Sequence, residues 1–254
     1  CGVVGIKPSY GRVSRAGVMP LAFSLDCVGP LARSVRDAAM VLQAIAGPDP
    51  RDSTTVDAPP PDLLSTLELG VKGLTIAVPD TLGDCDGEIS SAFEAAVDVF
   101  RRAGAEIRQT RLPDLDRATR LAALITAVEG AAYHANWLRT RPQDYGPQTR
   151  ARLLPGLYQP AVRYLEALSL RAPLLAEFMA ESLAGADAFL LPASPVTTPT
   201  IAETDVGGDP AALQKVLSMA RYTRLANLLG VPAISMPAGF DRNGMPIGLQ
   251  IIGR

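Results

Sequence analysis

Leu74-Thr75-Ile76-Ala77-Val78 is a short apolar run, rich in β-branched residues, and it predicts a buried β-strand. The segment after it carries apolar residues at helical spacing, and this helix is expected to end at Gly104. Its apolar face consists of Ile89, Phe93, Ala96, Val97 and Phe100. A second strand is predicted from Ala105 to Thr110. A strand, a helix and a strand in this order indicate a parallel strand pair joined by a right-handed crossover.

Similar patterns extend on both sides of this unit. Further strands are predicted at Gly2–Ile6, Leu25–Val28, Asp187–Leu191, Ala233–Pro237 and Pro246–Ile252, the last two joined as a hairpin by Asn243-Gly244. Further helices are predicted from a capping box at Ser34 and Asp37 to Gly47-Pro48, through most of Leu115–Leu183 with breaks near Pro142 and Pro155, and at Ala211–Leu229. We therefore predict an α/β fold whose largely parallel or mixed sheet is covered by helices on both faces. Gly2–Ile6 and Ile247–Ile252 are apolar at adjacent positions, so both are expected to be interior strands.

Residues 48–62 form a Pro/Asp-rich segment with almost no apolar content. Such a segment predicts either a domain linker or an exposed loop, and we favour the loop because apolar elements resume directly after it. The chain starts without Met, and its last strand-like segment ends two residues before the final Arg254. We therefore expect residues 1–254 to be part of one larger domain, incomplete at both ends.

The composition describes an ordinary globular chain and excludes several classes of function. The net charge is −2 and the basic residues form no run, so nothing indicates direct nucleic-acid binding. No uncharged apolar stretch reaches the roughly 18–20 residues of a membrane span. Cys1, Cys27 and Cys85 show no CxxC spacing, and the single His gives no metal-ligand pattern. We expect a cytoplasmic protein without a disulfide framework or a metal site.

Four blocks of sequence, in this order, resemble the amidase signature family. They are Cys1-Gly2-Val3-Val4-Gly5-Ile6-Lys7-Pro8-Ser9-Tyr10-Gly11-Arg12-Val13-Ser14, the stretch from Phe23-Ser24-Leu25-Asp26-Cys27-Val28-Gly29-Pro30 to Ala39, Asp187–Pro199, and Asn227–Phe240 continuing into Gly244–Gln250. Each block alone is weak, but their order and spacing match the family across essentially the whole chain. The family's Gly/Ser-rich signature is absent from the 254 residues.

The resemblance implies a reaction, and it also implies that the residues performing it lie outside this chain. Amidase signature enzymes hydrolyse amides with a Ser–cisSer–Lys triad through an acyl-enzyme, and they need no metal or cofactor. In the family the segment resembling Cys1–Ser14 follows the nucleophile loop directly, so all three triad residues would precede Cys1. We therefore expect the C-terminal portion of an amidase, inactive alone, with a small-molecule amide as its partner and a homodimer among its expected assemblies.

The resemblance also implies candidates for substrate-binding residues. Pro195, Val196 and Thr197 lie in a Pro/Thr-rich loop similar to the one beside the family's substrate pocket, and the alternative is a rigid surface loop. Arg152 looks like an arginine that meets the substrate's α-carboxylate in related amidotransferase subunits, and the alternative is a solvated helix face. We expect the loop and Arg152 to share one pocket with the first residues of the chain.

Two other residues invite a catalytic interpretation that we disfavour. Lys7 could serve as a general base if its pKa were depressed, but it matches a lysine inside a turn motif of the family. His134 is the only histidine, and no nucleophile motif such as G-x-S-x-G accompanies it, so a packing or surface role is expected.

Three functions are compatible with this sequence. The first is a stand-alone amidase that converts a carboxamide to a carboxylate and ammonia. The second is the A subunit of a tRNA-dependent amidotransferase, but such subunits carry an aspartate seven residues before Asn227, and this chain has Ala220 there. The third is a non-catalytic fragment.

Overall fold

A computed structural model describes residues 1–205, 213 and 216–254, and its centre is a seven-stranded sheet with the order β2-β1-β6-β7-β5-β3-β4. The strands are β1 (Val4–Lys7), β2 (Leu31–Ala32), β3 (Thr75–Pro79), β4 (Glu106–Thr110), β5 (Ala188–Pro192), β6 (Ala233–Phe240) and β7 (Pro246–Ile252). β3 runs parallel to β4 and β5, whereas the other neighbouring pairs are antiparallel. The sheet is therefore mixed, and the predicted parallel pair of β3 and β4 is confirmed.

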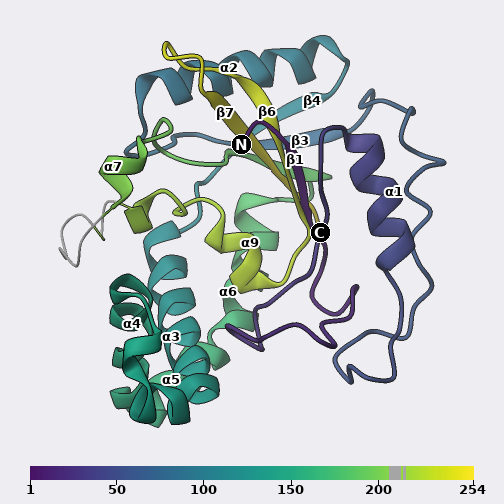
Figure 1. Cartoon of the computed structure of the whole chain (residues 1–254). Helices are drawn as coiled ribbons and strands as arrows, with labels where there is room; N and C mark the ends of the chain where they lie inside the picture. The colour runs from purple at the N-terminus through teal and green to yellow at the C-terminus, as the bar shows by residue number, and fades with distance from the viewer. Residues whose placement is uncertain (206–212, 214–215) are drawn as a thin grey trace.

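Helices surround this sheet (Figure 1). The α-helices of the described residues are α1 (Val35–Ile45), α2 (Gly87–Arg102), α3 (Leu115–Thr140), α4 (Pro147–Leu153), α5 (Ala161–Ser169), α6 (Arg171–Glu177), α7 (Ile201–Thr204) and α9 (Arg224–Leu229). Three shorter helical segments are η1 (Pro142–Asp144), η2 (Leu154–Tyr158) and the π-helical η3 (Phe178–Ser182). The predicted breaks near Pro142 and Pro155 thus coincide with η1 and η2.

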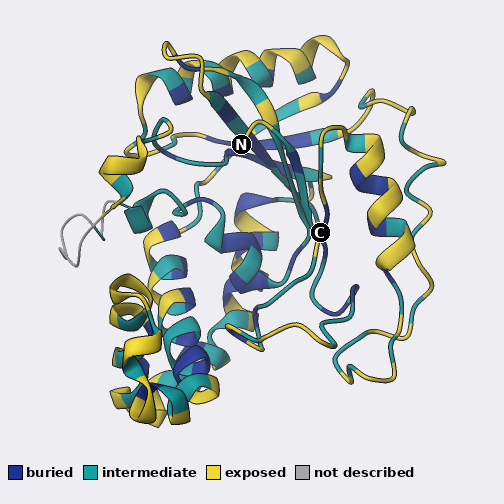
Figure 2. Cartoon of the chain, in the orientation of Figure 1, coloured by how far each residue is buried: buried dark blue, intermediate teal, exposed yellow. Residues whose placement is uncertain are grey.

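Alternate side chains of the central strands enter two separate cores. In β5, Phe189 and Leu191 pack into a core built with α3, α6 and α9, while Leu190 packs into a core built with α2. In β3, Ala77 belongs to the first core, and Ile76 belongs to the second. Figure 2 shows the resulting pattern, with buried residues along the strands and exposed residues on the outer sides of the helices. The prediction of helices on both faces is confirmed.

The two strands expected inside the sheet both have neighbours on each side. β7 lies between β6 and β5, and most of its side chains are buried. β1 lies between β2 and β6, with Val4 buried and the rest half-buried. The hairpin of β6 and β7 is also confirmed, and Gly244 takes the positive φ of its turn, 74°.

Local hydrogen bonds explain one confirmed boundary and one wrong prediction. Ser34 caps α1, because its Oγ accepts a hydrogen bond from the Asp37 backbone N–H at 3.1 Å. Leu25–Val28, predicted as a strand, is a turn followed by irregular backbone. The carboxylate of Asp26 accepts the backbone N–H groups of Leu21 and Ala22, at 2.9 and 3.0 Å, and folds the chain back on itself.

The helix predicted for Ala211–Leu229 is wrong over part of its length. Residues 219–223 form a turn, and α9 begins after it at Arg224. Residues 211, 212, 214 and 215 of that prediction lie outside the described part of the chain. The helix ends as expected at Gly230, which has a left-handed φ of 76°.

Residues 48–62 contain no helix or strand, and part of the segment is tied to the N-terminal region. Asp49 accepts a hydrogen bond from the Ser14 hydroxyl at 2.7 Å, and Asp52 accepts one from the Arg15 backbone N–H at 2.8 Å. Hydrogen bonds from Arg51 to Asp49 and from Thr54 to Asp52, together with these two, hold the pKa values of both carboxyl groups below their usual range. The loop therefore braces the chain that follows β1.

Gly29 allows the Gly-Pro segment to approach β1 closely. A Cβ atom at this position would overlap the Ile6 carbonyl oxygen, and the Pro30 carbonyl accepts the Ile6 N–H at 3.0 Å. We predict that Gly29→Ala lowers the free energy of unfolding by about 1–3 kcal/mol, because the backbones must separate. Urea unfolding followed by circular dichroism measures this loss.

Gly87→Ala is the matched control for this substitution. No atom lies within 4 Å of a Cβ built on Gly87, which is the first residue of α2, so this change should be neutral or slightly stabilising. Equal stability of the two variants would contradict the close approach at Gly29.

Candidate functional site

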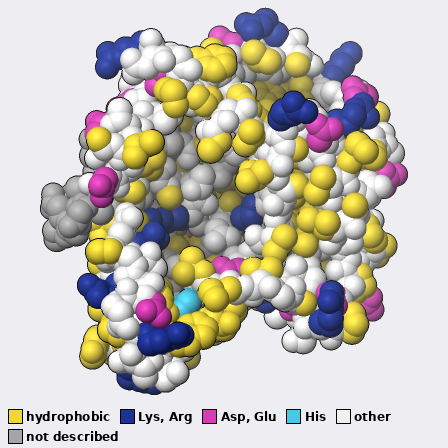
Figure 3. Space-filling model, viewed as in Figure 1, with side chains coloured by type: hydrophobic (Ala, Val, Ile, Leu, Met, Phe, Trp, Pro, Cys, Tyr) yellow, Lys and Arg dark blue, Asp and Glu magenta, His cyan; other side chains and the backbone are white. Residues whose placement is uncertain are grey.

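A cavity of about 920 Å³ lies between the sheet and the helices of the chain's middle third. Its lining comes from the end of β1, the 19–25 loop, α3, α4 and the start of α9. Figure 3 shows a hollow near the centre of the molecule with basic side chains on its walls. It is a wide site built by segments that are far apart in the sequence, which is typical of a pocket for a small molecule.

Three cationic side chains line this cavity. Lys7 comes from β1, Arg152 from α4 and Arg224 from α9. None of the described residues that line it is acidic. The cavity is therefore electropositive, and it favours an anionic ligand over a cationic one.

Lys7 is held by its neighbours at the wall of the cavity. Its Nζ donates a hydrogen bond to the Pro8 carbonyl at 2.9 Å and lies 3.9 Å from the Cys27 Sγ. Burial lowers the pKa of Lys7, and the nearby Cys27 opposes this shift. Burial raises the pKa of the Cys27 thiol, which disfavours its reactive thiolate form. These contacts agree with a structural role for Lys7, which lies at the end of β1 rather than in the turn that the resemblance implied.

Arg152 and the first strand of the chain meet at this cavity, but the Pro195–Thr197 loop is not among its lining residues. The loop lies instead at the start of α2. The Pro195 carbonyl accepts a hydrogen bond from the Asp86 N–H at 2.8 Å, and the Thr197 N–H donates to the Asp86 carboxylate at 3.0 Å. The Val196 carbonyl accepts the Ser194 hydroxyl at 2.9 Å. A role of the loop in substrate binding stays a prediction.

His134 lies on α3 and also lines the cavity. Its Nδ1 shares a hydrogen bond of 2.8 Å with the Tyr145 hydroxyl. Its ring also packs against the rings of Tyr133 and Trp137. The histidine is thus part of an aromatic cluster at the cavity wall.

The sequence did not reveal the buried Glu129, which holds one wall of the cavity in place. Glu129 is only 1% exposed, and its carboxyl group accepts the Ser24 backbone N–H at 2.9 Å and the Tyr164 hydroxyl at 2.8 Å. These bonds join α3, α5 and the loop that supplies Leu21 and Leu25 to the cavity. The available signal was an acidic residue at a position of α3 surrounded by apolar and small residues.

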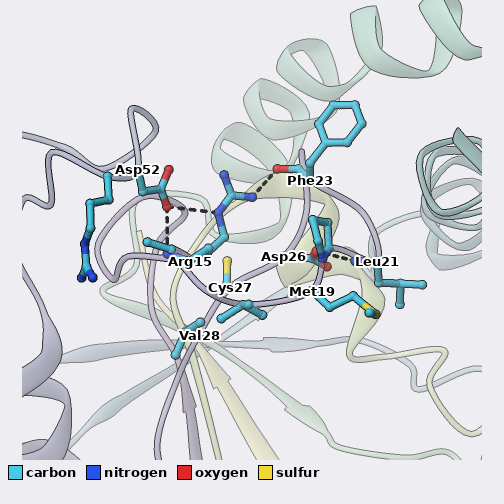
Figure 4. Close-up of a pocket in the computed structure, with 12 residues that line it drawn as sticks. Arg15, Met19, Leu21, Phe23, Asp26, Cys27, Val28 and Asp52 are labelled. Atoms are coloured by element: carbon cyan, nitrogen blue, oxygen red, sulfur yellow. Dashed lines mark hydrogen bonds and ion pairs between the residues drawn. The ribbon is translucent and has the colours of Figure 1, made fainter. Parts of the chain in front are cut away.

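A second, smaller pocket of about 380 Å³ lies beside the 15–28 loop (Figure 4). Its polar groups bind one another, because Arg15 bonds to Asp52, Thr54 and the Phe23 carbonyl. Asp26 is engaged by backbone N–H groups. Few of its polar groups are left to recognise a ligand, so the larger cavity is the better candidate.

Neither a metal-binding cluster nor a membrane-spanning helix occurs in the described part of the chain. No three His, Cys, Asp or Glu residues within it are placed to hold a metal ion. Among the same residues, no helix is both long and apolar enough to cross a membrane. Cys1, Cys27 and Cys85 are free thiols.

Comparison with known proteins decides the family. The Amidase family model matches residues 1–254. This chain belongs to the amidase family. The A subunit of the glutamyl-tRNA(Gln) amidotransferase of Trichlorobacter lovleyi is 38% identical, over 100% of this chain and 56% of the relative. The chain therefore spans about half the length of the curated relatives it matches.

Solved structures of the amidase family have the same fold. The A subunit of the glutamyl-tRNA(Gln) amidotransferase of Thermotoga maritima is 36% identical, with a TM-score of 0.81 over 100% of this chain and 54% of the other. A protein from a vestigial complex that reveals the evolutionary origins of an s-triazine catabolic enzyme is 31% identical, with a TM-score of 0.86. That match covers 100% of this chain and 55% of the other.

The Glu129 network makes a prediction about stability. Tyr164→Phe removes one donor from a buried carboxyl group, so we expect the free energy of unfolding to fall by about 1–3 kcal/mol at pH 7. Burial and the hydrogen bond to Glu129 raise the pKa of Tyr164 from 10.0 to about 12. The neutral phenol's contribution is therefore fully present below pH 10 and lost as the pH rises through about 12.

Urea unfolding at pH 7 and pH 9 measures this loss, which should be the same at both values. Tyr158→Phe is the matched control, since Tyr158 is 82% exposed and its substitution should change little. A loss no larger than that of the control would show that the hydrogen bond contributes nothing.

Proposed function

We propose that this chain is the C-terminal portion of one amidase domain, and that the whole protein hydrolyses a carboxamide to a carboxylate and ammonia. The observation that carries this proposal is the match of the Amidase family over all 254 residues, together with the electropositive cavity that the same residues enclose. The Ser–cisSer–Lys triad of the family is proposed to lie before Cys1. A cytoplasmic location agrees with the free thiols.

In the proposed reaction the triad serine attacks the amide carbonyl and forms a tetrahedral intermediate whose oxyanion accepts hydrogen bonds from backbone N–H groups. The C–N bond then breaks, and the leaving nitrogen takes a proton and departs as ammonia. Water attacks the acyl-enzyme and releases the carboxylate. This chain's contribution is to bind and orient the substrate.

Arg152 is the proposed anchor of that substrate. Arg152 and Asn227 both line the cavity, and the Asn227 side-chain amide can donate to a carbonyl and accept from an N–H group. A bidentate contact between a guanidinium and a carboxylate fixes both the position and the orientation of a small molecule. Pro195, Val196 and Thr197 are proposed to border the substrate in the whole enzyme, from their position at the start of α2.

A subunit of an amidotransferase is the second candidate, because several relatives carry that name. One observation weighs against glutamine as the substrate. The position that resembles the aspartate meeting the substrate's amino group is Ala220, and none of the described residues lining the cavity is acidic. An ammonium group would thus find cations rather than a carboxylate, and we favour a stand-alone amidase.

We predict that the 254-residue chain alone releases no ammonia from a panel of aliphatic and aromatic amides, whereas a chain extended upstream through the Gly/Ser-rich loop does. Loss of a triad member typically costs several orders of magnitude in rate, and here all three members are proposed to lie upstream. Coupled detection of ammonia compares the two proteins.

The control variant for that assay is Lys7→Ala. Activity of the short chain that persists through purification and disappears in Lys7→Ala would mean that Lys7 is catalytic and that the chain is complete. Inactivity of both the short and the extended chain would favour a non-catalytic fragment.

We also predict that Arg152→Gln in the extended protein raises KM for carboxylate-bearing amides by about 10–100-fold, because a charge-assisted contact is lost. Neutral amides such as propionamide should be little affected. Arg150→Gln is the matched control, since Arg150 is on the same helix but not among the cavity's lining residues. An equal effect on charged and neutral amides would exclude a carboxylate-binding role for Arg152.

A further inference from the structure

A second guanidinium shares the cavity with Arg152. Arg224 is the first residue of α9 and lines the wall formed by that helix, whereas Arg152 comes from α4. Arg224 is half-buried, and Arg152 is exposed at the cavity. Two cations supplied by separate elements therefore face one space that is large enough for a small molecule.

Arg224 is fixed in place and yet keeps free donors. Its backbone N–H donates to the Ala220 carbonyl at 3.2 Å, and its Nη2 donates to the Leu217 carbonyl at 3.2 Å. A guanidinium carries five N–H donors, and within the described residues the Arg224 side chain uses one of them, in its bond to Leu217. A carbonyl partner orients the guanidinium without neutralising its charge.

Neither arginine forms an ion pair with a carboxylate in the described part of the chain. By contrast, Arg221, three residues before Arg224, pairs with Asp116 at 3.1 Å, and Arg15 pairs with Asp52. Burial lowers the pKa of Arg224, and the charge of Arg152 lowers it further. Two cations that line one cavity and have no carboxylate partner among the described residues favour the binding of anions there.

We propose that this cavity selects amides that carry two carboxylate groups, one bound by Arg152 and the other by Arg224. The inference rests on the proposed role of the cavity as the amide-binding site. Apolar side chains, among them Leu21, Leu25 and Leu217, line the cavity and suit a short carbon chain between the anionic groups. The same charges disfavour amino-acid amides, whose ammonium group would lie among cations.

The test is calorimetric titration of the protein extended upstream through the Gly/Ser-rich loop, which contains both arginines, at low ionic strength. Malonate, succinate and glutarate are compared with their monomethyl esters, which have nearly the same shape and one charge fewer. At least one dicarboxylate should bind about tenfold or more tightly than its ester, because a second charge-assisted contact is made. Equal binding of each pair, or no binding of any dicarboxylate, overturns the proposal.

Variants of Arg224 assign the second contact. Arg224→Gln should remove the preference for the dicarboxylate and leave the affinity for the ester within about twofold, while Arg224→Lys should keep part of the preference. Arg221→Gln is the matched control and should behave as the unchanged chain, because Arg221 does not line the cavity. An equal loss of dicarboxylate and ester binding in Arg224→Gln, with circular dichroism unchanged, would overturn the assignment.

The dicarboxylate-binding assay can fail independently of the hydrolysis assay, so it tests this inference separately from the proposed function. An extended protein that hydrolyses neutral amides but binds no dicarboxylate would disprove only the selection of dianions. Conversely, tight dicarboxylate binding by a protein that never releases ammonia would disprove only the proposed hydrolysis.

Discussion

The central strands must be apolar on both faces, and the rest of the molecule is arranged around that constraint. Phe189 and Leu190 are adjacent in β5, yet they enter different cores and both are fully buried. Because successive side chains of a strand point to opposite faces, a helical layer is needed on each side of the sheet. α2 supplies one layer, and α3, α6 and α9 supply the other. The cavity is lined by α3 and α9 of this second layer, together with α4, the 19–25 loop and the end of β1.

Much of this architecture is local in origin and was accessible from the sequence. The runs at β3 and β5 are short, continuous and apolar, which is the pattern of strands covered on both faces. Ser34 and Gly230 mark helix ends through backbone conformations that their own residue types favour. Leu25–Val28 had the same apolar character as a strand, but the Asp26 carboxylate binds two preceding N–H groups and imposes a turn. Apolar content alone does not show that a side chain will bind the backbone N–H groups that a strand would otherwise use.

The site was harder to predict from the sequence, because it depends on contacts between residues that are far apart in the chain. Arg152 was identified through a family resemblance, whereas Arg224 lies in a segment predicted as continuous helix and carries no motif of its own. The turn at 219–223, which the helical periodicity concealed, sets where α9 begins and thus where Arg224 lies. In the sequence, Glu129 is only one acidic residue on a predicted helix. Its partners Ser24 and Tyr164 lie far from it in the chain. Long-range hydrogen bonds of this kind leave no periodic signal.

The walls of the cavity come from the first strand, the middle helices and the last third of the chain. Because these segments are far apart in the sequence, the cavity forms only after all three have folded. Contacts between residues distant in sequence require large loops to close, and such contacts slow folding. Neither the N-terminal third nor the middle helices alone can assemble the cluster of Lys7, Arg152 and Arg224. The proposed anion-binding pocket can therefore form only after all three segments of the chain have been synthesised and folded together.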